Sequence, residues 1–101
     1  MAVKFTVSPI KKHNDFQFVI VEFSIESGVI EPAELKEIVP PQVPSKSGVI
    51  LSGRGPIWLF CFLAHHFHTA TFIGSFDPRL GAAVVTESHV KGIAPGDLIP
   101  V

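Results

Sequence analysis

The chain has 101 residues, of which 47% are hydrophobic and 17% are charged, and its mean hydropathy is +0.42. This length suits one core, so residues 1–101 are expected to form a single domain, and the composition excludes intrinsic disorder. Eight Lys and Arg against nine Asp and Glu give a net charge of -1, which excludes a broad cationic surface for long DNA or RNA. Any nucleic-acid ligand should therefore be small and held in a pocket.

The cysteine content and the apolar runs indicate the cellular compartment in which the protein is expected. Cys61 is the single cysteine, so the chain cannot form an internal disulfide, and a reducing cytoplasm is the expected compartment. The N-terminal residues do not form a signal peptide, because lysines alternate there with apolar residues. The most apolar run, residues 56–64, is far short of the ~20 residues that span a bilayer. We therefore expect no membrane segment.

The first half of the chain predicts two strands and a helix. Residues 4–10 and 16–23 are rich in Phe, Val and Ile and flank His13-Asn14-Asp15, which predicts a hairpin. The second strand is apolar at both parities and should be central in its sheet. Residues 31–38 predict a short helix with proline in its first turn, and the proline-rich residues 39–47 predict a loop.

The second half predicts a buried strand at residues 48–51 and a helix at 57–67. Strands at 71–76 and 81–85 bracket Asp77-Pro78-Arg79, and the turn at 95–97 leads into a last short strand. The order β-β-α-β-α-β-β predicts an α+β sandwich, with helices packed on a mixed or antiparallel sheet.

A glycine-rich segment, Ser52-Gly53-Arg54-Gly55-Pro56, lies where a strand should end and a helix begin. Two glycines allow the backbone to approach a ligand closely, and helix amides together with Arg54 attract an anion. The segment lacks the Lys and the spacing of a Walker loop, and Pro56 removes one amide donor. A phosphate cradle and a plain glycine turn both remain open.

Histidines cluster at the end of the same predicted helix. His65 and His68 are three residues apart and can converge on one face, whereas His66 points elsewhere. Paired imidazoles can bind a metal or transfer protons near neutral pH. Histidines also close helix C-termini simply because their charge complements the helix dipole, so this pattern alone does not decide.

The segment Asp77-Pro78-Arg79 follows an apolar strand and should lie at a sheet edge. Asp77 can ligate a hard cation or accept a proton, and Arg79 can hold a phosphate. The alternative is a turn in which the two side chains pair with each other. His89 follows the next strand, and a hairpin between the two strands would return it towards Asp77; a solvated loop histidine is the alternative.

Aromatic side chains occur on every side of the predicted 57–67 helix. They are Trp58, Phe60, Phe62 and Phe67. This distribution favours full burial or an oligomer interface over a platform for base stacking.

Three segments together resemble a known family: Ser52-Gly53-Arg54-Gly55-Pro56-Ile57-Trp58-Leu59, Cys61-Phe62-Leu63-Ala64-His65, and Asp77-Pro78-Arg79-Leu80-Gly81. They are similar to the small ring nucleases of type III CRISPR systems, the Csx-three family, and the match is dense over residues 48–85. The resemblance implies a ferredoxin-like domain, distantly similar to ligand-sensing CARF domains, that works as a homodimer. It also implies Mn²⁺-dependent cleavage of cyclic tetra-adenylate to linear di-adenylate, which switches off antiviral signalling.

The resemblance also implies roles for individual residues. Ser52, Gly53, Arg54 and Gly55 match ligand-binding positions, and His65 is grouped with them. His68 and Asp77 match the catalytic pair, and Arg79 matches an adjacent phosphate contact. The implied Mn²⁺ ligands are Asp77, His68 and His89. The family is also expected to hold its ligand between two dimers, in which case no single chain contains a complete site.

Three alternative functions stay open at this stage. The domain could sense cyclic oligoadenylate without cutting it, although His68 and Asp77 argue against a pure sensor. It could be a Mn²⁺-dependent exonuclease that removes adenosines from RNA 3′ ends, although it has few basic residues for a long RNA. It could also be a structural module that binds a metal or an anion.

Overall fold

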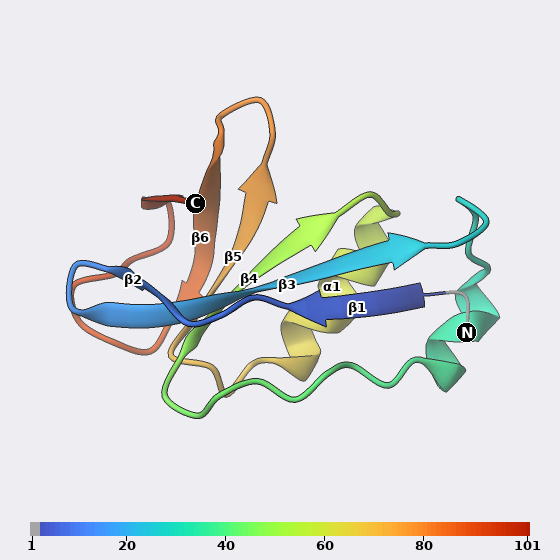
Figure 1. The fold of residues 1–101 in the computed structure, drawn as a ribbon, viewed down its shortest axis with the longest axis horizontal. Coiled ribbons are helices and arrows are strands. Elements are labelled where there is room, and N and C mark those ends of the chain that lie inside the picture. The colour runs from blue at the N-terminus through green and yellow to red at the C-terminus, as the bar shows by residue number, and fades with distance from the viewer. Residues whose placement is uncertain (1–2) are drawn as a thin grey trace.

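Strands β3, β4 and β5 form the parallel centre of the sheet in the computed structural model, which describes residues 3–101 (Figure 1). These strands span Phe16–Ile25, Gly48–Gly53 and Phe72–Asp77. Strands β3 and β4 pair in parallel, and so do β4 and β5. Each parallel pair requires a crossover, which residues 26–47 provide after β3 and α1 (Ile57–His66) provides after β4.

Antiparallel strands extend this centre on both sides. β1 (Val3–Val7) and β2 (Lys11–His13) both pair with β3, while β6 (Ala82–Ser88) pairs with β5, and β7 (Leu98–Pro100) pairs with β6. The seven-stranded sheet has the order β1-β3-β4-β5-β6-β7, with β2 beside β3. The predicted α+β class with a mixed sheet is confirmed.

The structure differs from the prediction in the first strand. Residues 4–10 do not form one strand, because β1 ends at Val7 and the pairing with β3 resumes only at Lys11. Pro9 lies between them and has no N–H to donate to a ladder. The extra strand here is β2, whereas β7 is the short last strand expected after the turn at 95–97, which the order β-β-α-β-α-β-β does not count.

The two predicted helices are present with altered character or bounds. The first is η1, a 3-10 helix at Pro32–Glu37, in which Glu31 and Glu34 form a reciprocal capping box. The second, α1, ends at His66, so His68 lies in the turn that follows and not in the helix. Within residues 3–101, no helix is both long and apolar enough to cross a membrane.

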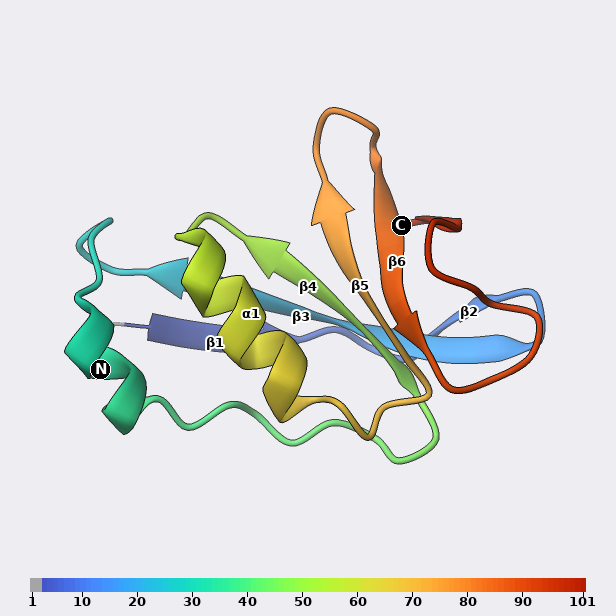
Figure 2. The same ribbon diagram turned by 180° about the vertical axis from the view of Figure 1, so that it is seen from behind.

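Helix α1 lies across the back of β3 and β4 (Figure 2). Its buried residues Leu59 and Leu63, followed one turn later by Phe67, form an i, i+4 stripe against Val21 and Val49 of these strands. Burial of each leucine side chain contributes about 1.5–3 kcal/mol relative to exposure. This contact fixes the direction in which the chain crosses from β4 to β5.

A second core lies on the other face of the sheet. Phe18, Ile50 and Phe72 point away from α1 and pack with Ile93 and Ile99. The sheet can close over this core because β5 and β6 rise steeply away from β1 and β3 (Figure 1). The first half of β3 is therefore covered on both faces as predicted, whereas its second half presents exposed Glu22 and Ser24.

Gly48 offers a test of this second core. A Cβ atom at residue 48 would overlap the buried ring of Phe72, which cannot move without disturbing its neighbours. Gly48→Ala should lower the free energy of unfolding by about 1–3 kcal/mol, the usual cost of overpacking, in urea denaturation. Ser24→Ala, at an exposed position of β3, is the control and should stay within about 0.5 kcal/mol. Equal stability of the two variants would contradict the packing of Phe72 on Gly48.

Candidate functional site

The carboxyl ends of β3, β4 and β5 meet at one edge of the sheet, which we call the carboxyl edge. Parallel strands end on the same side, and such an edge is the usual ligand site of sheets that contain parallel strands. Here it collects two of the segments identified in the sequence, because β4 ends at Gly53 and β5 ends at Asp77. Ser52 to Gly55 and Asp77 to Arg79 therefore lie at the same end of the molecule.

The two glycines of the first segment are explained by close packing on Phe23. Gly53 has φ +151°, and a Cβ atom there would lie 2.6 Å from the backbone oxygen of Phe23. At Gly55 it would lie 2.9 Å from the Phe23 ring. Packing on Phe23 explains why both positions are glycine, and it is compatible with either a phosphate cradle or a plain glycine turn. Arg54 lies exposed between these glycines and makes no hydrogen bond or ion pair within residues 3–101.

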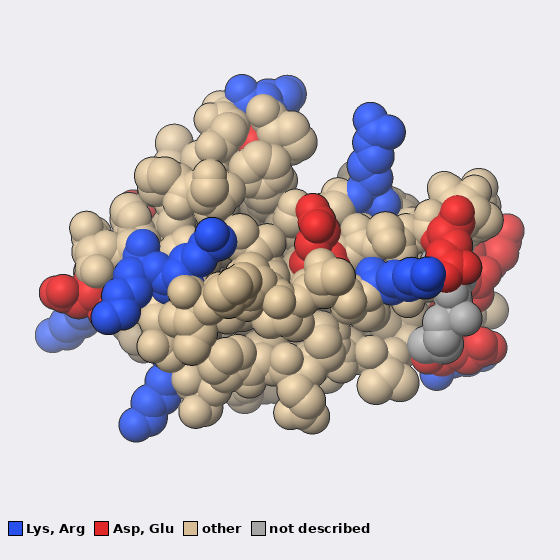
Figure 3. All heavy atoms as spheres, viewed as in Figure 1, with Lys and Arg blue, Asp and Glu red and all other residues tan. Residues whose placement is uncertain are grey.

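A groove of about 760 Å³ lies beside this turn, on the sheet face opposite α1, and we call it the carboxyl-edge groove. Ser52, Gly53 and Arg54 form one part of its lining, and Phe76 with Pro78 forms another. Figure 3 shows the hollowed surface between the raised β5–β6 hairpin and the rest of the sheet. The groove gives Arg54 a concave site in which a small anion could lie.

Several groove residues were missed from the sequence, among them Lys4, Thr6 and Glu22. The strand register places them, since Thr6 pairs with Glu22 and Glu22 pairs with Ser52. The polar alternation Glu22, Ser24 at the end of β3 was the available signal for an exposed face. Lys4 is engaged by Glu26 at 3.0 Å, which leaves Arg54 as the cation best placed to meet a ligand.

Asp77 and Arg79 pair with each other in the turn after β5. The backbone N–H of Arg79 donates to Asp77 Oδ1 at 2.9 Å, and Nη2 of Arg79 lies 3.1 Å from Oδ2. These side-chain and backbone hydrogen bonds from Arg79 hold the pKa of Asp77 below its ordinary value, so Asp77 is ionised at neutral pH. The Arg79 side chain is 88% exposed, and its remaining N–H groups can still meet a phosphate.

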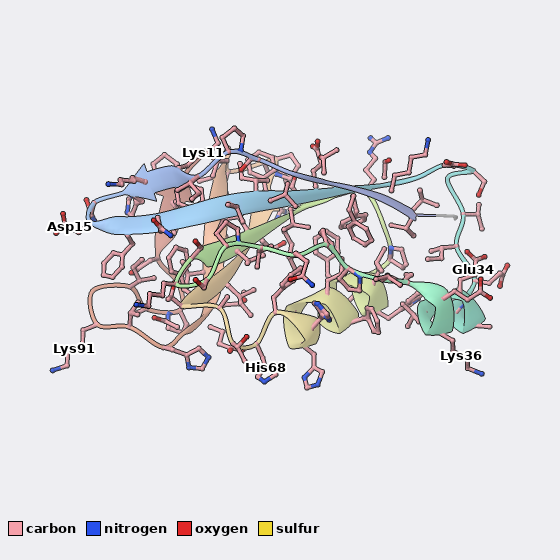
Figure 4. The ribbon with its side chains drawn as sticks, turned by 60° about the horizontal axis from the view of Figure 1, so that its bottom comes forward. Lys11, Asp15, Glu34, Lys36, His68 and Lys91 are labelled. Carbon is pink, nitrogen blue, oxygen red and sulfur yellow. The ribbon has the colours of Figure 1, made fainter. Side chains whose placement is uncertain are left out.

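His65 and His68 converge as predicted. Their rings stack with centroids 5.5 Å apart and 16° between the planes. The Nδ1 atom of His68 lies 2.9 Å from the carbonyl oxygen of His65. A carbonyl oxygen only accepts, so Nδ1 carries the proton in neutral His68, and Nε2 keeps its lone pair. Figure 4 shows His68 projecting outward from the turn after α1, where Nε2 can accept a proton from a ligand.

His89 lies beside His68 and not beside Asp77. The hairpin of β5 and β6 was predicted correctly, but its register pairs Asp77 with Ala82 and Phe72 with Ser88. The antiparallel strands therefore return His89 to the start of β5, where its backbone N–H donates to Thr71 at 2.9 Å. Its ring Nε2 lies 3.0 Å from the His68 carbonyl oxygen and 2.6 Å from Glu87 Oε2. The expected approach of His89 to Asp77 is wrong.

The expected metal-ligand set is therefore not assembled in one chain. At about 3.3 Å per residue, the six residues of β5 keep Asp77 at the opposite end of the strand from His68 and His89. Among residues 3–101, no group of three His, Cys, Asp or Glu side chains is placed to hold one metal ion. Asp77, His68 and His89 do not fit a shared Mn²⁺ within a single chain.

Two sequence comparisons found relatives of this chain. Residues 23–100 match the family model described as CRISPR-associated protein (Cas_csx3). An uncharacterized protein of Aquifex aeolicus (strain VF5) is 44% identical over 94 residues, which cover 89% of this chain and 83% of that protein. The family match includes the carboxyl-edge groove from Phe23 onward and the histidine cluster. The chain therefore belongs to the CRISPR-associated Cas_csx3 family.

Proposed function

We propose that this protein is a ring nuclease that binds cyclic tetra-adenylate in the carboxyl-edge groove and cleaves it to linear di-adenylate. Cutting this messenger would end type III CRISPR signalling in the cytoplasm. The observation that carries the proposal is Arg54, an exposed guanidinium with no partner among residues 3–101, beside a groove of about 760 Å³. Membership of a CRISPR-associated family supports it.

The near-neutral charge of the chain suits a small cyclic ligand. Cyclic tetra-adenylate has only four phosphates and is symmetric, so two copies of the Ser52 to Gly55 turn across a dimer axis would match it. Arg54 would hold a phosphate by charge-assisted hydrogen bonds, and the Ser52 hydroxyl would add a donor. A net charge of -1 is compatible with such a pocketed ligand but not with a long RNA track. We propose a homodimer as the binding unit.

Cleavage would use the separated residues from different chains. His68 would act as the general base through its exposed Nε2, while Asp77 and Arg79 would face the same phosphate from another chain. A requirement for Mn²⁺ is part of this proposal, but its ligands would have to come from two chains. A second dimer placed over the ligand would meet that condition, and it would present the histidine end of one chain to the carboxyl edge of another.

A non-catalytic sensor of cyclic oligoadenylate is the second candidate. It is favoured by the ion pair between Asp77 and Arg79. If Asp77 serves only to stabilise this turn, it has no catalytic role, and the protein would bind the ring without cleaving it. We also propose the finer fold relationship, a ferredoxin-like domain distantly related to CARF ligand sensors. The parallel strands β3 and β4, with Arg54 at their carboxyl ends, are compatible with a ligand-sensing ancestry.

One prediction of the proposed function separates ligand binding from cleavage. Arg54→Ala should weaken binding of labelled cyclic tetra-adenylate by roughly tenfold or more, because a charge-assisted hydrogen bond contributes about 1.5–3 kcal/mol. Asp77→Asn should keep the ring bound but abolish formation of di-adenylate, because it removes the negative charge and keeps an oxygen for the turn. Filter binding and a cleavage time course in Mn²⁺ or EDTA measure the two properties.

The controls for this prediction change a carboxylate and a basic side chain outside the proposed site. Asp15→Asn and Lys91→Ala change exposed charges outside the proposed site, and both should behave as the wild type (Figure 4). Linear poly-adenylate is the control substrate: its degradation, with the ring left intact, would make the protein the deadenylating exonuclease. A ring that binds tightly and survives with every variant would make it a sensor.

Another prediction tests whether the active site takes His68 and Asp77 from two different chains. Asp77→Asn and His68→Ala should each be inactive alone, but their mixture should regain part of the cleavage activity, because a site between chains can then take His68 and Asp77 from different variants. Activity is measured after mixing equal amounts at micromolar concentration. The double variant, mixed with either single variant, supplies the control. Inactivity of the mixture, with ring binding preserved, would contradict a site shared between chains.

A further inference from the structure

A second hollow, of about 430 Å³, opens at the start of α1 beside the carboxyl-edge groove, and we call it the Trp58 hollow. Ile25, Val29 and Ile30 line one part of it, and Pro56 with Trp58 lines another. Its volume falls within the range of roughly 300–1,000 Å³ that is usual for small-molecule sites. The hollow is separate from the groove, but it lies on the same end of the molecule.

The two concave sites share part of their lining. Ile25, Gly28 and Arg54 line both of them, so a ligand could extend from one into the other. Gly28 has φ +79°, and a Cβ atom added there would meet nothing within 4 Å. The absence of a side chain at Gly28 therefore leaves open space at a position that lines both the groove and the hollow. This space could take the sugar that links a phosphate to its base.

The chemistry of the Trp58 hollow differs from that of the groove. Arg54 is its single charged lining residue, whereas the groove also contains Lys4 and Glu22. Val29 is 66% exposed and adds an accessible apolar side chain to the rim of the hollow. An apolar wall with an indole suits a flat, uncharged aromatic ring, and the Arg54 guanidinium at its border can hold the phosphate of the same ligand.

We infer that the Trp58 hollow receives an adenine base of the ligand whose phosphate is bound by Arg54. This inference rests on the proposed function and deepens it, since it assigns a base-binding subsite to the same site. From the sequence, the even distribution of aromatic side chains around α1 favours burial or an oligomer interface over stacking on a base. In the structure, however, Leu59 and Leu63 occupy the core while Trp58 stays partly exposed.

The protein carries its own probe for this subsite. Trp58 is the single tryptophan and the chain has no tyrosine, so fluorescence excited in the indole band reports on the Trp58 hollow alone. Cyclic tetra-adenylate and 5′-AMP should each quench this emission in a saturable way, because a base that stacks on the indole shares its π surface. Ribose 5-phosphate has the same phosphate but no base, and it should leave the emission unchanged.

A pair of matched variants tests the hollow without disturbing the core. Val29→Glu puts a carboxylate on the rim of the hollow and should weaken binding of cyclic tetra-adenylate by roughly tenfold or more, as expected when one stacked base is lost. Val39→Glu is the control, since Val39 is 75% exposed and lies outside both the groove and the hollow. It should bind as the wild type does. Circular dichroism of both variants checks the fold.

The outcomes separate this inference from the proposed function. Tight ring binding without quenching, together with equal affinities of the two glutamate variants, would overturn the adenine subsite and leave the ring nuclease standing. Failure of the wild type to bind the ring would overturn the proposed function. In that case the 5′-AMP titration still decides: quenching that ribose 5-phosphate cannot produce supports the hollow as an adenine site, and no quenching rejects it.

Discussion

The parallel alignment of β3, β4 and β5 is the constraint on which the remaining structure depends. It places Ser52 and Asp77 at the same edge, because each lies in the last two residues of its strand and the two strands run in the same direction. It also requires α1 to carry the chain back along the sheet before β5 can begin. The residues that end α1 must then lie at the other edge. The separation of His68 from Asp77 is thus a consequence of chain topology and not of local side-chain choice.

Most elements and the hairpin partners could be predicted from the sequence, but the parallel pairings and the register of the strands could not. Glycines, prolines and apolar runs mark where α1 and β5 begin, because these signals are local. Which strand lies beside which is decided by contacts far apart in the chain. Lys4 and Glu22 were missed for this reason, since only the pairing of β1 and β4 with β3 brings them to the groove.

The wrong expectation for His89 also arose from the register of paired strands. The hairpin was predicted correctly, yet a hairpin returns each residue to the level of its partner and not to the turn. Asp77 lies near the turn, whereas His89 lies beyond the far end of β6. The two residues therefore lie at opposite ends of the hairpin. Counting residues from the turn would have corrected the expectation.

The fold also determines how the two edges could cooperate. The sheet between them is built from β4 and β5, whose buried residues Val49, Ile50 and Ile73 are packed on both faces, and such interiors resist large deformation. Bending the chain until His68 met Asp77 would break both cores and the ladder between these strands. Binding of a second chain disrupts neither the cores nor the ladder, because that chain can present its histidine end to the carboxyl edge as a rigid body. Joint action of these residues on one phosphate therefore requires assembly and not a change of shape.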